Sequence, residues 1–171
     1  PGQQDSGHNP ALHEDTMTFP LFDLSGRTAL VTGGSKGIGL ALARALASAG
    51  ARVVLNARDA ARLAAARAGL AAEGHAVDAV AFDVTDADAV ARGVAEVEDR
   101  VAPIDILVNN AGMQFRSPFA EFPVEAWRQL TATNIDSVFL TGRAVAQRMV
   151  ARRRGKIINV CSVQSELARP G

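Results

Sequence analysis

Three glycines, at positions 33, 37 and 39, have the spacing that points most directly to chemistry in this chain. They lie in the segment TGGSKGIG at 32–39, after an apolar run and before an Ala- and Leu-rich run. Backbone without Cβ atoms can approach a pyrophosphate, and a helix that begins near Gly37 directs free N–H groups and its positive dipole end at an anion. An ordinary tight turn is the alternative. The pattern predicts a strand, a dinucleotide-binding turn and a helix, with contacts from Gly33, Ser35, Lys36, Gly37, Ile38 and Gly39.

The elements that must position this turn alternate regularly along the chain. The periodicity predicts strands over 28–32, 52–56, 76–82, 104–109 and 156–161, and helices over 37–49, 59–73, 86–101 and about 124–152. Several of the strands are apolar on both faces, which is typical of a parallel sheet covered by helices on each side. We therefore expect an α/β fold with a doubly wound parallel sheet of the Rossmann type.

The end of the second predicted strand indicates which dinucleotide binds. In such folds a carboxylate near this point accepts hydrogen bonds from a ribose 2′-hydroxyl, but here Asn56 and Ala57 lead to Arg58. A guanidinium at position 58 can bind a 2′-phosphate, and Lys36 adds a second positive charge. NADP is therefore expected, with NAD as the alternative. In that alternative Arg58 is a solvated surface residue, and Asp59, the expected N-cap of the next helix, turns inward to the ribose.

Two more segments follow strands at the same edge of the predicted sheet. Asp83 and Val84 follow the third strand, and Asn110, Ala111 and Gly112 follow the fourth. Ligands of open α/β sheets lie at the carboxyl ends of the strands. Asp83 is expected to reach the adenine amino group, with a helix cap as its alternative role, and the small residues after the fourth strand let the cofactor ribose approach.

The glycine turn and the Asn-Asn-Ala-Gly segment at 109–112 together resemble the short-chain dehydrogenase/reductase family, over residues 24–171. The resemblance implies two catalytic residues: Ser162, which hydrogen-bonds the substrate oxygen, and Asn134, which holds a water for proton relay. Asn134 also lies among poor helix formers, so a bend in the long helix is expected there. The structural alternatives are a hydroxyl at a strand end for Ser162 and a polar residue at a kink for Asn134.

The sequence departs from the family at its catalytic acid. That acid is a Tyr with a Lys four residues later, and this chain contains no Tyr. We expect the chain to end before that pair, because the strand at 156–161 would otherwise be a bare apolar sheet edge. Residues 17–171 are then the N-terminal dinucleotide-binding part of one Rossmann domain, which binds the adenine half of a cofactor without turnover. Residues 1–16 are predicted to be a disordered leader or a cloning remnant.

The segments at 110–114, 116–119 and 161–167 resemble the members of that family that interconvert gluconate and 5-ketogluconate. The resemblance implies a sugar-acid substrate, with Arg116 on its carboxylate and Gln114 and Gln164 on its hydroxyls. A solvent-facing loop charge is the alternative for Arg116. Two other functions stay open: a 3-oxoacyl thioester (acyl carrier protein) reductase of the same family, and a non-catalytic NADP-binding module.

The amino-acid composition argues against several classes of binding partner. Eighteen basic residues balance eighteen acidic ones, so no overall field favours nucleic acid or an anionic membrane. One Cys and three scattered His residues exclude an internal disulfide and offer no metal-ligand spacing, and no apolar run is long enough to span a bilayer. Arg152, Arg153 and Arg154 are interpreted as the solvated end of the long helix. We expect a cytoplasmic protein without a metal, and the resemblance implies a homodimer or homotetramer.

Overall fold

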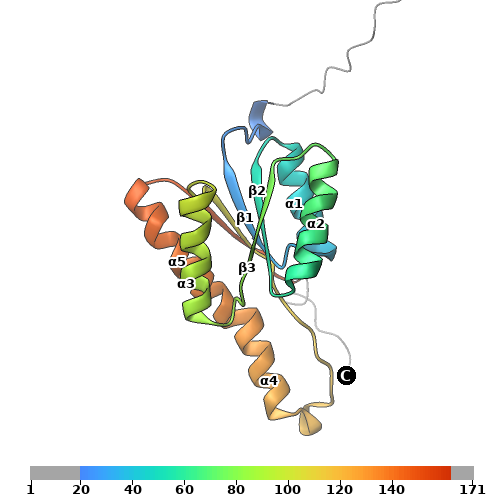
Figure 1. The fold of residues 1–171 in the computed structure, drawn as a ribbon. Coiled ribbons are helices and arrows are strands. Elements are labelled where there is room, and N and C mark those ends of the chain that lie inside the picture. The colour runs from blue at the N-terminus through green and yellow to red at the C-terminus, as the bar shows by residue number, and fades with distance from the viewer. Residues whose placement is uncertain (1–19, 163–171) are drawn as a thin grey trace, which may run out of the picture.

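The computed structural model describes residues 20–162, and its centre is a parallel sheet of five strands in the order β3-β2-β1-β4-β5 (Figure 1). The strands are β1 (Thr28–Thr32), β2 (Arg52–Ala57), β3 (Val77–Ala81), β4 (Ile106–Asn109) and β5 (Lys156–Asn159). The sheet grows outward from β1 in both directions, so the predicted doubly wound α/β fold is confirmed. The leader predicted over 1–16 lies outside the described residues.

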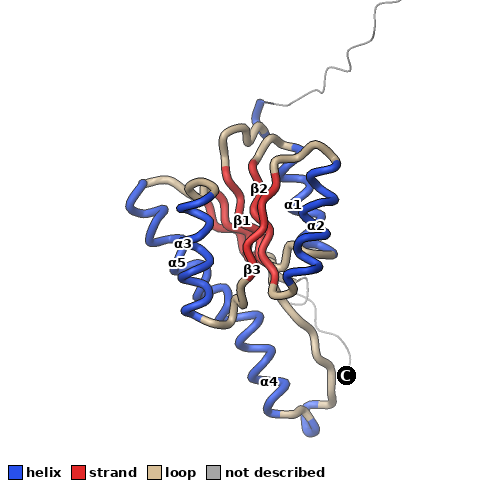
Figure 2. The backbone as a smooth tube through the Cα atoms, viewed as in Figure 1, coloured by secondary structure: helices blue, strands red, loops and turns tan. Residues whose placement is uncertain are grey.

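Helices cover both faces of the sheet (Figure 2). One face carries α1 (Gly37–Ser48) and α2 (Ala60–Ala72), and the other carries α3 (Ala87–Arg100) and α5 (Ser137–Arg152). The helix α4 (Val124–Thr131) projects away from the sheet, and short 3-10 helices lie at Pro20–Phe22 and Phe119–Glu121. Parallel strands require such crossover helices, because a tight hairpin cannot return the chain in the same direction.

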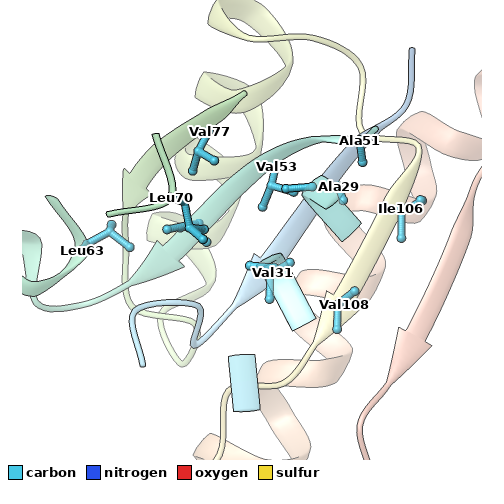
Figure 3. Close-up of a cluster of buried hydrophobic side chains, with 12 residues drawn as sticks. Ala29, Val31, Ala51, Val53, Leu63, Leu70, Val77, Ile106 and Val108 are labelled. Atoms are coloured by element: carbon cyan, nitrogen blue, oxygen red, sulfur yellow. The ribbon is translucent and has the colours of Figure 1, made fainter. Parts of the chain in front are cut away.

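The core consists of two apolar layers, one on each side of the sheet. Consecutive strand side chains point to opposite faces, so Val31 enters the layer under α1 and α2 while Leu30 enters the layer under α3 and α5. Figure 3 shows Val31, Val53 and Leu70 among the side chains of the first layer. All five residues of β1 are buried, as expected of a central strand without a solvated face.

The helix predicted over 124–152 is divided into three parts. Between α4 and α5 the backbone forms a π-helical turn, Ala132–Asp136, in place of regular α-helix. Hydroxyl side chains beside it bond to backbone carbonyls: Thr131 Oγ1 donates to Arg128 O (3.0 Å), and Ser137 Oγ donates to Thr133 O (2.6 Å). Such bonds compete with the regular helical pattern. The irregularity expected at Asn134 therefore takes the form of a wider helical turn.

The outermost strand, β5, differs from the sequence-based expectation. It ends at Asn159 rather than at residue 161, and all four of its residues are exposed. Ile157 and Ile158 point to opposite faces and are 40% and 48% exposed. Within the described residues β5 is therefore the bare sheet edge that its apolar run led us to expect.

The basic end of α5 packs against buried carboxylates. Arg152 donates two hydrogen bonds to Glu98 (2.7 and 3.0 Å), and Arg154 Nε donates one to Asp105 (2.8 Å). The side chains of Glu98 and Asp105 are only 7% and 8% exposed. Because an unpaired buried carboxylate is costly, these arginines fix the α5–β5 connection to the sheet. Arg152 and Arg154 are themselves exposed, as expected of a solvated helix end, and they also pair with carboxylates that are buried.

Replacing Gly93 with Ala should destabilise the fold although Ala favours helices. A Cβ at position 93 would lie 2.6 Å from Cε1 and 2.7 Å from Cγ of the buried Phe82, so either the Phe82 ring or α3 would have to move. We expect a loss of about 1–3 kcal/mol in the free energy of unfolding, measured by urea denaturation. Gly69→Ala is the control, since its Cβ meets no atom within 4 Å and should stabilise α2 by about 0.5–1 kcal/mol. Equal effects of the two substitutions would contradict this account.

Candidate functional site

The turn between β1 and α1 lies against the segment that follows β4, with no room for a side chain between them. A Cβ at Gly39 would overlap Gly33 O and lie 2.5 Å from Asn110 Nδ2, and one at Gly33 would lie 3.0 Å from Ala111 Cα. Gly37 has a φ of +55°, a conformation that favours glycine. The glycines thus bring two backbone segments together at the carboxyl edge of the sheet.

Hydrogen bonds hold these two segments in place. The Asn110 side chain donates to Thr32 O (3.0 Å), and the Thr32 hydroxyl accepts from the backbone N–H groups of Asn110 (3.0 Å) and Ala111 (3.1 Å). The same hydroxyl donates to Val108 O (3.3 Å). The ends of β1 and β4 are therefore coupled through a single buried hydroxyl and one amide.

A hollow of about 670 Å³ opens at this edge. Every residue predicted to bind a cofactor lines it: Gly33, Ser35, Lys36, Gly37, Ile38, Gly39, Arg58, Asp83, Val84, Asn110, Ala111 and Gly112. The N-cap residue of α1, Lys36, makes no capping hydrogen bond with its side chain. The first-turn N–H groups of α1 thus face the hollow without a side-chain acceptor at the cap, which is the arrangement that binds anions.

The hollow contains an ion pair between two of the predicted residues. Arg58 Nη1 lies 3.5 Å from Asp83 Oδ2, and Asp83 Oδ1 accepts from the backbone N–H (2.9 Å) and the hydroxyl (2.8 Å) of Thr85. Partial burial raises the pKa of the Asp83 carboxyl, but the Thr85 hydrogen bonds and the Arg58 charge outweigh it and hold the pKa below its ordinary value. Asp86, rather than Asp83, is the N-cap of α3.

Two residues at the end of β2 have structural partners. Asn56 is buried and donates through Nδ2 to Phe82 O (3.1 Å), which ties β2 to the end of β3. Asp59 is the expected N-cap of α2, and its Oδ1 accepts from the backbone N–H of Arg62 (3.0 Å). The Arg62 side chain also lines the hollow, which sequence reasoning missed. Its position three residues after the predicted cap was the available signal, because the first turn of α2 faces the same edge.

A second hollow, of about 880 Å³, adjoins the first. It brings together the predicted catalytic residues Asn134 and Ser162 with the predicted substrate residues Gln114 and Arg116. Gln164, also predicted to bind substrate, lies outside the described residues. The two hollows share Ile38 and the segment 110–113, so one ligand can extend from the first into the second.

Asn134 fixes the loop that separates the two hollows. Its Oδ1 accepts from Met113 N (2.8 Å), and its Nδ2 donates to Met113 O (3.0 Å). The π-helical turn therefore presents an amide to the backbone after β4. Because an amide has two donors and two lone pairs, Asn134 retains one of each for a further partner.

A chain of neutral polar side chains begins at the lining of the second hollow and continues to α5. Asn109 Nδ2 donates to Asn159 Oδ1 (2.9 Å), and the Thr141 hydroxyl donates to Asn109 Oδ1 (2.7 Å). These bonds connect β5, β4 and α5. Sequence reasoning missed Asn109 and Asn159 in this role, because their contact depends on the register between β4 and β5, in which the two residues are partners.

Some other kinds of site are absent from residues 20–162. Within that range no group of His, Cys, Asp and Glu side chains is placed to hold a metal ion. No helix in the same range is both long and apolar enough to cross a membrane. The single cysteine, Cys161, is exposed beside Ser162.

The fold and the glycine-lined edge agree with the sequence comparison. The family model described as short chain dehydrogenase matches residues 27–171. The chain therefore belongs to the short chain dehydrogenase family.

Particular relatives are known within that family. The chain is 58% identical to the gluconate 5-dehydrogenase of Gluconobacter oxydans (strain 621H) over 156 residues, which cover 91% of this chain and 61% of that protein. It is 44% identical to the 5-keto-D-gluconate 5-reductase of Escherichia coli (strain K12), over 87% of this chain and 59% of that protein. The crystal structure of a gluconate 5-dehydrogenase from Burkholderia cenocepacia J2315 in complex with NADP and tartrate matches with a TM-score of 0.84 at 51% identity, over 87% of this chain and 58% of that one. The chain thus spans less than two thirds of the length of these relatives.

Replacing Arg58 with Gln should raise the pKa of Asp83. The folded-state pKa lies below the ordinary value of 3.8, so ionised Asp83 contributes stability above that pH, and the contribution is lost as the pH falls through the lower folded-state pKa. Without the guanidinium this loss should begin at a higher pH. A carboxyl-carbon NMR titration of Asp83 measures the shift, with Arg44→Gln as the control because Arg44 pairs with Glu73 instead. An unchanged titration in Arg58→Gln would refute the pairing.

Proposed function

We propose that the first hollow binds NADP and that the whole protein is an oxidoreductase that interconverts a hydroxyl and a ketone on a sugar acid. The observation that carries the proposal is the close approach of Gly33 and Gly39 to the segment after β4, beside the free start of α1. A Cβ in this cradle would fill space that a pyrophosphate needs. The residues present therefore fit a dinucleotide.

In this proposal each part of the nucleotide meets a different group of residues. The pyrophosphate lies on the backbone N–H groups at 37–39, the adenine amino group on Asp83, and the 2′-phosphate between Arg58 and Lys36. Two observations favour NADP over NAD. Arg58 is largely exposed in its ion pair and can turn toward a phosphate, and the carboxylate of Asp59 is engaged in capping α2. The Burkholderia relative named above was crystallised with NADP.

The second hollow is proposed to hold the substrate beside the nicotinamide, whose ring supplies or accepts the hydride when bound. Ser162 donates a hydrogen bond to the reacting oxygen and so holds it in place. Asn134 holds a water through the donor and lone pair that Met113 leaves free, and this water relays the proton. We propose that residues 1–171 alone bind nucleotide without turnover, because the family's acid is a Tyr and this sequence contains none.

Arg116 is proposed to recognise the carboxylate of the substrate. It lies in the loop after β4 and lines the second hollow with Gln114, whose amide can bond to hydroxyls. Within the described residues Arg116 forms no ion pair, so its charge is available. The relatives named for gluconate and 5-keto-D-gluconate support a sugar acid as the substrate class.

The whole protein is proposed to be a cytoplasmic homodimer or homotetramer. Phe139 and Val150 on α5 are 65% and 74% exposed, and large apolar side chains at such exposure are typical of a surface that a partner covers. The family resemblance pairs this helix with its copy in a second subunit.

Gly39→Ala should weaken NADP binding by at least about tenfold in isothermal titration, because the new Cβ would push the turn away from Asn110. Gly142→Ala in α5 is the control, since its Cβ meets nothing within 4 Å and should leave the affinity unchanged. If Gly39→Ala binds NADP with the parent affinity, the proposed role of Gly33 and Gly39 in making room for the pyrophosphate is refuted. Failure of the parent chain to bind either nicotinamide dinucleotide would refute the proposed function itself.

Arg116→Leu in the whole protein should raise KM for gluconate about tenfold or more while changing KM for a neutral polyol little, because only the acid offers a carboxylate. Steady-state kinetics with both substrates measure the difference. Equal changes for both substrates would remove the carboxylate role from Arg116. A higher turnover of acyl thioesters than of sugar acids would favour the alternative reductase activity.

A further inference from the structure

Asp59 and Arg62 lie at the end of the first hollow where the proposed 2′-phosphate meets Arg58, and the proposed function gives Arg62 no role in choosing the ligand and uses Asp59 only as a cap. The helix α2 begins there, directly beyond the end of β2 (Figure 1). A carboxylate at this position repels a phosphate and accepts a hydrogen bond from a ribose hydroxyl. Whether a neighbouring cation neutralises the Asp59 carboxylate therefore affects the choice between NADP and NAD.

Both oxygens of Asp59 face Arg62. Oδ1 accepts the backbone N–H of Arg62 (3.0 Å), and Oδ2 lies 3.8 Å from Arg62 Nε. The cap bond uses the backbone, so it persists whatever side chain occupies position 62. The ion pair, in contrast, depends on the guanidinium. The two contacts can therefore be separated by substitution.

The charges that line this end of the hollow form two such pairs and one free cation. Arg58 pairs with Asp83 and Arg62 with Asp59, while Lys36 forms no ion pair within the part of the chain that the structure describes. The five lining charges therefore give a net charge of +1. Loss of the Arg62 charge would make this net charge zero and leave Asp59 uncompensated, whereas loss of the Asp59 charge would raise it to +2.

We propose that Arg62 is a specificity-determining residue, which favours a 2′-phosphorylated adenosine by neutralising the Asp59 carboxylate. The inference rests on the proposed nucleotide site. With Arg62 in place, Asp59 repels a 2′-phosphate weakly and is a poor acceptor for a 2′-hydroxyl. Without it, the same carboxylate repels NADP and offers its free oxygen to the ribose of NAD.

The pair geometry favours this indirect role over direct phosphate binding by Arg62. Arg62 Nε lies 3.8 Å from the carboxylate of Asp59, which is fixed by its cap bond, and Arg58 supplies a second guanidinium at the same end. Asp59 and Arg62 are both about half exposed, with side-chain exposures of 52% and 54%. At that exposure an ion pair contributes at most about 1 kcal/mol, which limits the expected effect to about fivefold in affinity.

The test is isothermal titration of the 171-residue chain with NADP and with NAD at low ionic strength. Arg62→Gln should lower the ratio of NADP affinity to NAD affinity about fivefold, and Arg62→Lys should retain the parent ratio. Asp59→Asn keeps an acceptor for the cap and should raise the ratio. In the Asp59→Asn background, Arg62→Gln should change the ratio by less than about twofold, because there is no carboxylate left to neutralise.

Arg44→Gln is the matched control, since it removes one positive charge from an exposed arginine that pairs with Glu73 outside the hollow. It should leave the ratio unchanged. An equal effect of Arg62→Gln on both nucleotides, or an undiminished effect in the Asp59→Asn background, would overturn this inference and leave the proposed function standing. If the parent chain binds neither nucleotide, the proposed function fails and this inference fails with it.

Discussion

The approach of the β1–α1 turn to the end of β4 is the constraint on which the site depends. Gly33 and Gly39 leave no space for a Cβ, and Thr32 joins the two backbones through its hydroxyl and its carbonyl. Both hollows begin at this junction and share Ile38 with the segment 110–113. A single added methyl group at Gly33 or Gly39 would push the two backbone segments apart. It would therefore change the shape of both hollows.

The two edges of the sheet are stabilised by different kinds of polar contact. At the amino edge, buried Glu98 and Asp105 pair with arginines from the end of α5, which anchors the connection to β5 far from any hollow. At the carboxyl edge, the neutral side chains of Asn109, Thr141 and Asn159 connect the same elements. This neutral network adds no charge at that edge, where Arg58 pairs with Asp83 and Lys36 lines the first hollow.

The sequence was sufficient to predict the sheet, the glycine turn and the lining of the first hollow, because these features depend on local signals. Apolar runs define the strands, and residues that directly follow strands meet at one edge. The pairing of Arg152 with Glu98 and of Arg62 with Asp59 could not be predicted, since it depends on side-chain direction in the folded state. The exposed edge at β5 was expected, but its end at Asn159 was not, because a strand's end depends on its pairing with the neighbouring strand.

The π-helical turn at Ala132–Asp136 interrupts the regular helix between α4 and α5. It holds one residue more than an α-helical turn, and that geometry places the Asn134 amide against Met113. Deletion of one residue there would restore regular hydrogen bonding to a continuous helix and at the same time withdraw the amide from the loop after β4. Shortening this segment would thus stabilise the helix and loosen the loop that separates the two hollows.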